Sequence, residues 1–198
     1  MFNESNVRRV RLAASVMAIV SAALFLRSNV NAQQSPKLSI PDVVVRDHRG
    51  RKVHFYSDLV KDKVVVLNFF YTSCTYTCTL QGRTFSKLQS LLQDRLGKSV
   101  YLISVTTDPA TDNPKRLRSW AKRYQRKAGW TLVTGDESEI NKLLVHFTGS
   151  SAAPGMHLPV TFVVNDEKGT WISSTEAVAP EQLFKTVDYL TREDKKQR

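Results

Sequence analysis

Two almost uninterrupted apolar runs, residues 64–70 and 100–105, constrain the fold of this chain more than any other feature. Runs of this kind are typical of strands buried on both faces, as in the centre of a parallel sheet. The segment between them is predicted to be a helix from about residue 77 to 96, ended by Gly97. A strand–helix–strand unit predicts an α/β protein in which helices pack against a sheet.

Shorter elements are expected on both sides of this unit. Residues 41–45 and 52–56 flank the turn Asp47-His48-Arg49-Gly50 and predict an N-terminal β-hairpin. The other expected elements are a helix opened by Pro114, a strand at 130–133, a helix at 137–147 with Asp136 as N-cap, a hairpin of 160–164 with 170–173, and a helix at 180–190. Together they predict an α/β sandwich with a mixed sheet.

The first 33 residues have the order of a secretory signal: basic residues at 8–11, an apolar run at 12–26 and small residues at 30–32. The run is shorter than the ~20 residues of a membrane span, but an uncleaved signal anchor has the same order. We therefore expect 1–33 to be a signal peptide or signal anchor, 34–190 an exported domain and 191–198 a polar tail. The expected location is the bacterial periplasm or the outer face of the inner membrane.

Charge and cysteine content exclude several classes of protein. The 198 residues carry 29 Lys and Arg against 18 Asp and Glu, for a net charge of +11, and only two cysteines. Two cysteines are too few for a four-cysteine zinc or iron–sulfur site. Nucleic acid is not an expected partner of an exported protein.

The segment 115–127 holds seven basic residues and no acidic one. Its apolar residues recur at helical spacing, so it is predicted to be an amphipathic helix with a cationic outer face. Lys115, Arg118, Lys122 and Arg126 are expected to form a stripe on that face. The stripe is interpreted either as a solvated helix face or as a docking surface for an acidic protein or an anionic membrane.

Cys74 and Cys78 lie between the first buried strand and its helix. A disulfide closing so short a loop would contribute only about 2 kcal/mol, so a chemical role explains the pair better than a stabilising one. If the helix begins near Cys74, both sulfurs lie on one face of it. The start of a helix also favours thiolate, the form that binds metal or attacks disulfides.

At these residues the chain resembles the Sco/SenC family, thioredoxin-fold copper-binding factors of cytochrome oxidase assembly. The family motif Tyr-Thr-x-Cys-x-x-x-Cys is matched by Tyr71, Thr72, Cys74 and Cys78. Residues 106–114 and 130–135 resemble two further family segments, and His157 stands five residues before Phe162, at the spacing of the family's histidine. The resemblance extends from about residue 41 to 190.

The resemblance implies a thioredoxin-like α/β sandwich that binds one copper ion through Cys74, Cys78 and His157. Asp108, Met156 and Pro159 are candidate supporting residues. Pro159 stands where many thioredoxin-like redox enzymes have a cis-proline, and Met156 is either an extra soft ligand or a pocket-lining side chain. Copper(I) prefers thiolate and imidazole ligands, which agrees with two cysteines and one histidine as the implied ligands. The implied acceptor is a cupredoxin-like protein such as the CuA subunit of cytochrome c oxidase.

The remaining histidines are not expected to bind metal. His48 and His54 belong to the predicted hairpin and are expected at the surface. His146 ends a predicted helix, where a cation is favourable, and is expected to be structural.

Two classes of function remain open. The first is a metallochaperone that delivers copper to the acceptor or keeps the acceptor's cysteines reduced. The second is a thiol–disulfide oxidoreductase or redox sensor, in which Cys74 reacts first and Cys78 resolves the mixed disulfide.

Overall fold

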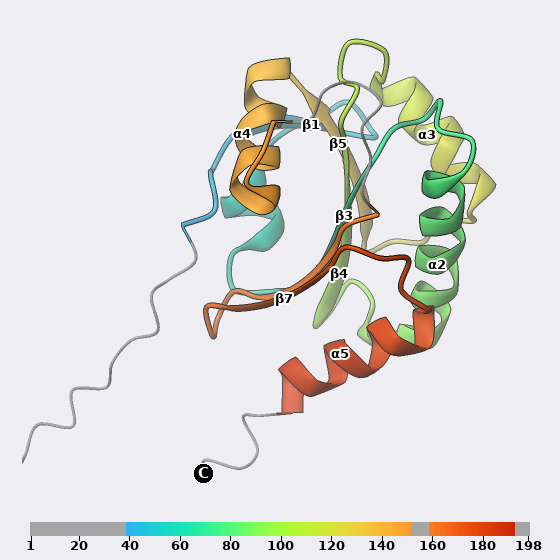
Figure 1. The fold of residues 1–198 in the computed structure, drawn as a ribbon, viewed down its shortest axis with the longest axis vertical. Helices are drawn as coiled ribbons and strands as arrows, with labels where there is room; N and C mark the ends of the chain where they lie inside the picture. The colour runs from blue at the N-terminus through green and yellow to red at the C-terminus, as the bar shows by residue number, and fades with distance from the viewer. Residues whose placement is uncertain (1–38, 152–158, 193–198) are drawn as a thin grey trace, which may run out of the picture. The chain divides into compact units, whose positions relative to one another are not determined.

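Seven strands form one open, mixed sheet in the computed structural model, which describes residues 39–151 and 159–192 (Figure 1). The strands are β1 (Val44–Asp47), β2 (Lys52–His54), β3 (Val64–Phe70), β4 (Val100–Thr106), β5 (Trp130–Gly135), β6 (Thr161–Asn165) and β7 (Thr170–Ser174). Their order is β2-β1-β5-β4-β3-β6-β7. The central strands β3, β4 and β5 are parallel, and the outer pairs are antiparallel.

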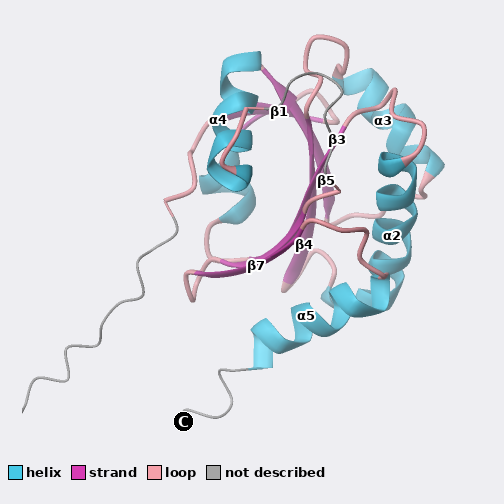
Figure 2. Ribbon diagram, viewed as in Figure 1, coloured by secondary structure: helices cyan, strands magenta, loops and turns pink. Residues whose placement is uncertain are grey.

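Helices cover both faces of this sheet (Figure 2). One face carries α2 (Thr77–Leu92), α3 (Pro114–Arg123) and α5 (Pro180–Arg192), and the other carries α4 (Glu137–Thr148) and a π-helical turn, η1 (Phe55–Val60). A short 3₁₀ turn, η2 (Gln93–Arg95), follows α2. Because the central strands are covered on both faces, they need apolar residues at almost every position.

The side chains of β3 alternate between the two halves of the core. Val65, Leu67 and Phe69 pack on the side of α4, whereas Val66 and Phe70 pack on the side of α2 and α3. The predicted bounds of this strand are confirmed. The register pairs Phe70 with Thr106, so β3 and β4 end at the same edge of the sheet.

The one polar residue of β3 belongs to a buried hydrogen-bonded chain. The Trp130 indole N–H donates to Ser104 Oγ over 3.0 Å, and the Ser104 hydroxyl donates to Asn68 Oδ1 over 2.7 Å. Because a buried polar group needs a hydrogen-bond partner, these two hydrogen bonds allow Asn68 to lie inside an apolar strand.

The predicted mixed α/β sheet and both hairpins are confirmed, with shifted ends. Helix α2 ends at Leu92 instead of residue 96, and α5 continues through Arg192, two residues into the predicted polar tail. Asp136 does occupy the N-cap position of α4, but its side chain makes no capping hydrogen bond.

The prediction that His48 lies at the surface is wrong. His48 is 6% exposed because the β1–β2 turn packs against β5, where its Nδ1 accepts a hydrogen bond from the Leu132 N–H over 3.4 Å. Burial, with a smaller contribution from the charge of Arg126, lowers its pKa from 6.5 to about 4. His54 is exposed, as predicted.

The predicted stripe on the basic helix is also partly wrong. Helix α3 ends at Arg123, and Gln125 follows with a left-handed backbone (φ 51°). The turn directs Arg126 inward, where its guanidinium donates to the carbonyl oxygens of Lys127 and Trp130 over 2.9 and 2.8 Å. Lys115, Arg118 and Lys122 remain exposed on α3.

The predicted signal or anchor (1–33) and the end of the tail (193–198) lie outside the described residues. Among the helices of residues 39–151 and 159–192, none is both long and apolar enough to cross a membrane.

Candidate functional site

The two cysteines lie at the carboxyl edge of the sheet, between β3 and α2. Cys74 is half-buried in the loop after β3, and Cys78, the second residue of α2, is 1% exposed. Helix α2 begins at Thr77, as predicted, so Cys74 lies in the loop before the helix and Cys78 in its first turn. Both are free thiols.

The start of the helix nevertheless brings the sulfurs together. The backbone N–H of Cys78 donates to Cys74 Sγ over 3.2 Å, and a hydrogen bond joins the two thiols. The first N–H groups of a helix have no partner within the helix, so the Cys74 sulfur occupies the place of a capping acceptor. The loop thus places one sulfur against the positive end of α2 and the other just inside it.

The two thiols differ in acidity. Burial raises the pKa of Cys74, but hydrogen bonds from the Cys78 thiol, the N–H groups of Cys78 and Tyr76 and the Tyr71 hydroxyl outweigh burial and leave this pKa below its usual value. Burial, and the hydrogen bond with Cys74, raise the pKa of Cys78 far above its usual value. The first thiolate to form is therefore that of Cys74.

A buried carboxylate holds the cysteine loop in place. Asp112, whose side chain is fully buried, accepts hydrogen bonds from the Thr72 N–H over 2.9 Å, from the Thr72 hydroxyl, and from the Thr106 hydroxyl over 2.6 Å. The Arg116 guanidinium lies 3.7 Å from the same carboxylate and donates to Thr72 Oγ1 over 3.2 Å. Asp112 therefore joins the cysteine loop, the end of β4 and the start of α3.

Asp112 was not predicted as a site residue, although it lies in the 106–114 segment that resembles the family. Asp108, the predicted supporting residue, is half-buried, and among the described residues its carboxylate accepts one hydrogen bond, from the Thr111 N–H over 3.2 Å. Spacing alone does not distinguish the two acids, because only the fold shows which of them reaches Thr72.

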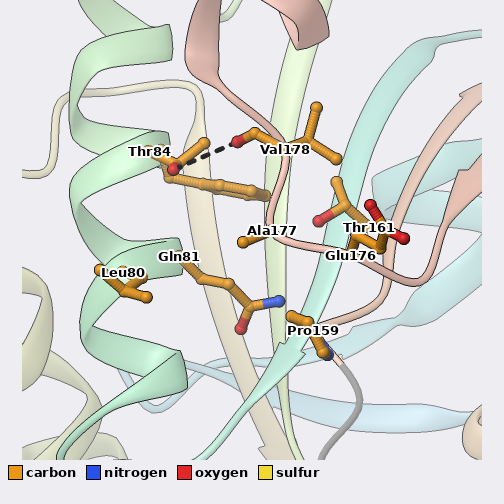
Figure 3. Close-up of a pocket in the computed structure, with 9 residues that line it drawn as sticks. Leu80, Gln81, Thr84, Pro159, Thr161, Glu176, Ala177 and Val178 are labelled. Carbon is orange, nitrogen blue, oxygen red and sulfur yellow. Dashed lines mark hydrogen bonds between the residues drawn. The ribbon is translucent and has the colours of Figure 1, made fainter.

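A small pocket lies beside α2 one turn beyond Cys78 (Figure 3). It is lined by Leu80, Gln81, Thr84, Phe85, Pro159, Thr161, Glu176, Ala177 and Val178. The Gln81 amide points into this pocket towards Pro159, and its Nε2 is buried with no hydrogen-bond partner among the described residues. The peptide bond before Pro159 involves residue 158, outside the described ranges, so the expected cis-proline stays a prediction.

The predicted third ligand, His157, and the supporting residue Met156 lie outside the described residues. Within residues 39–151 and 159–192, no group of three or more His, Cys, Asp or Glu side chains is placed to hold a metal ion. His146 is half-buried on the opposite face of the sheet, where it packs on Phe147 and Trp171. The described part of the site is therefore the pair Cys74 and Cys78, whose soft sulfurs are ligands that copper(I) prefers.

An open mixed sheet covered by helices on both faces, with a thiol pair at the start of its first long helix, defines a thioredoxin-like α/β protein. The SCO1/SenC family model matches residues 32–185, and the chain belongs to this family.

Known proteins agree with this assignment. The SCO1 protein homolog of Bacillus subtilis (strain 168) is 30% identical over 95 residues, which are 47% of this chain and 48% of that protein. The chain thus spans about half the length of the curated relatives it matches. The fold is similar to BsSco, described as a member of the Sco family of cytochrome c oxidase assembly proteins with a disulfide switch (TM-score 0.65, 19% identity, 81% of this chain and 98% of that one). It is also similar to copper-bound ScoI of Bradyrhizobium japonicum (TM-score 0.60, 19% identity, 74% and 95%).

Proposed function

We propose that this protein is an exported metallochaperone that binds one copper ion through Cys74, Cys78 and His157 and passes it to the CuA site of cytochrome c oxidase. The observation that carries the proposal is the paired thiols, one half-buried and one buried, at the start of α2 in a SCO1/SenC chain. Copper is the cargo of this site. The copper-bound family structure and the link of the family to oxidase assembly support the choice of metal and acceptor.

The arrangement suits a cargo that must leave again. Cys74 in the loop and Cys78 at the helix start supply a soft, partly exposed pair of sulfur ligands. The imidazole of His157 would complete a three-coordinate copper(I) site. The half-buried position of Cys74 gives an acceptor's ligand access to the metal, so that ligands can exchange one at a time.

Copper titration of the full chain tests the proposal. The reduced protein should bind one copper(I) ion, whereas protein oxidised to the Cys74–Cys78 disulfide should bind none, because oxidation removes both thiolates. Stoichiometric copper binding by the disulfide form would place the ligands elsewhere and overturn the proposal.

The acidity difference between the cysteines favours a second candidate, thiol–disulfide exchange. In this reaction the Cys74 thiolate attacks a partner's disulfide and releases one partner thiolate. The Cys78 sulfur, after losing its proton, then attacks the mixed disulfide and releases the second, leaving a Cys74–Cys78 disulfide. The same pair would in this way keep an acceptor's copper-binding cysteines reduced. A reduction potential near that of the periplasmic redox proteins, together with weak copper binding, would favour this candidate over copper delivery.

A further inference from the structure

The cations of α3 continue onto a second element and reach the cysteine loop. Arg118 Nη1 donates to the His48 carbonyl oxygen over 2.9 Å, which fixes the β1–β2 turn, with its exposed Arg49, beside the helix. At the start of the same helix, Arg116 Nε donates to Thr72 Oγ1, two residues before Cys74. We name the exposed cations Arg49, Lys115, Arg118 and Lys122 the basic surface.

The acidic groups near the basic surface are buried or paired with other cations. Within the described residues, none of its four cations forms an ion pair. From residue 109 to 135 the only acid is Asp112, and its side chain is fully buried. The nearby Asp47 is also buried and is engaged by Arg51 at 2.7 Å. The four exposed positive charges are therefore available to attract a negatively charged partner.

Helix stability does not account for the cations in the first turn of α3, whereas Lys122, in the last turn, is favoured by the helix dipole. Lys115 and Arg116 occupy the first turn of α3, which has no acidic residue, and cations at the positive end of a helix dipole are unfavourable. Lys115, Arg118 and Lys122 also repel one another at spacings of three and four residues. Each of these unfavourable effects costs a few tenths of a kcal/mol, so stability alone does not explain a cation at Lys115.

Resting on the proposed function, we propose that the basic surface docks an acidic protein surface on the copper acceptor and places its ligands over Cys74. A protein is favoured over a membrane because β3 and β4 end at one edge of the sheet, which brings the start of α3 and the cysteine loop together. A partner seated on α3 therefore lies next to the half-buried sulfur. Opposite charges guide such a partner mainly by raising the association rate.

Association of the full chain, metal-free, with the metal-free CuA domain of the oxidase subunit tests this docking without copper. Lys115→Glu/Lys122→Glu should lower the association rate constant about tenfold or more at low ionic strength, and salt should reduce the difference. Glutamate at position 115 favours the start of the helix and glutamate at 122 disfavours its end by a similar amount, so the double change should be nearly neutral for folding. The matched control, Lys61→Glu/Lys185→Glu, changes net charge equally at exposed lysines of other elements and should stay within about twofold of wild type.

Equal effects of the two double variants would overturn the proposal, because net charge alone would then explain them. Unchanged association of Lys115→Glu/Lys122→Glu also overturns it, and weaker binding of that variant to phosphatidylglycerol vesicles would then assign the surface to a membrane. Copper(I) affinity is measured separately and should equal that of wild type. A wild-type chain that docks but binds no copper would refute the proposed function and leave the docking surface standing.

Discussion

The carboxylate of Asp112 accepts a hydrogen bond from the backbone N–H of Thr72, 40 residues earlier in the chain and 2.9 Å away. Thr72 precedes Cys74 by two residues, so the buried carboxylate of Asp112 holds the backbone of the loop that carries Cys74 in place. The same carboxylate also accepts from the hydroxyls of Thr72 and Thr106. Removing this acceptor should therefore affect both stability and the cysteine pair.

Asp112→Asn should lower the free energy of unfolding by about 1–3 kcal/mol, because an amide nitrogen replaces one acceptor oxygen and leaves a buried donor unpaired. Urea unfolding measures this change. The reduced variant should also bind copper(I) more weakly, because the loop that carries Cys74 loses its anchor.

Asp108→Asn is the matched control for this prediction. Its carboxylate is half-buried and, within residues 39–151 and 159–192, accepts one hydrogen bond, from Thr111, so the free energy of unfolding should change by less than about 0.5 kcal/mol. Equal effects of the Asp108 and Asp112 variants would show that Asp112 has no special part in holding the loop.

Cys74→Ser, Cys78→Ser and His157→Ala should each weaken copper binding severely, because each removes a ligand of a three-coordinate site. Thermal unfolding of the metal-free variants should stay cooperative. Competition with a copper(I) chelator measures the affinities, and exposed His54→Ala serves as the control. Wild-type affinity in His157→Ala would remove this histidine from the ligand set.

Iodoacetamide should alkylate Cys74 well before Cys78 in the reduced, metal-free protein. Cys74 is half-buried with a lowered pKa, whereas Cys78 is buried with a raised pKa. The pH profile of alkylation should accordingly have a midpoint below that of an ordinary cysteine. Mass spectrometry of the peptides follows each site, and equal rates in Cys74→Ser and Cys78→Ser would contradict the assignment.

His48 should make the protein less stable as the pH falls from about 6.5 to about 4. Its pKa is 6.5 when unfolded and about 4 when folded, chiefly through burial and then the charge of Arg126, with Arg49 adding to this and Asp47 opposing it. In this pH window the unfolded chain binds the proton that the folded chain excludes, so stability is full above the window and declines within it by up to about 3 kcal/mol.

Urea unfolding at several pH values measures this dependence. His48→Asn should flatten it between pH 6.5 and 4, whatever its effect on stability at neutral pH. His54→Asn changes an exposed histidine and should keep the wild-type slope. An unaltered slope in His48→Asn would assign the dependence to other groups.

The local sequence was sufficient to predict a feature wherever neighbouring residues determine that feature. The apolar run of β3 predicted its bounds because a strand covered on both faces has few places for polar residues. Pro114 marked the start of α3 because proline suits the first helical position. The cysteine spacing indicated a paired thiol site, which forms because the Cys78 N–H at the helix start donates to the Cys74 sulfur in the loop before it.

The errors occur where distant segments meet. His48 belongs to a polar turn and was expected at the surface, but β5 covers it. Arg126 continues the helical spacing of the basic residues, but Gln125 turns it inward, where the carbonyl oxygens of Lys127 and Trp130 accept hydrogen bonds from its guanidinium. A pattern along one segment carries no information about what packs on it.

The sequence by itself determined the α/β class, the resemblance to a copper-binding family and the thiol pair, because each depends on residue type at short spacing. The tertiary structure alone decided which acid holds the loop, which thiol ionises first, and that Arg116 of α3 contacts the loop that carries Cys74. Asp112 meets Thr72, and Arg116 meets the same loop, only because β3 and β4 pair in parallel and end at one edge. Burial and hydrogen bonding, which set the acidity of Cys74 and Cys78, are properties of that packing.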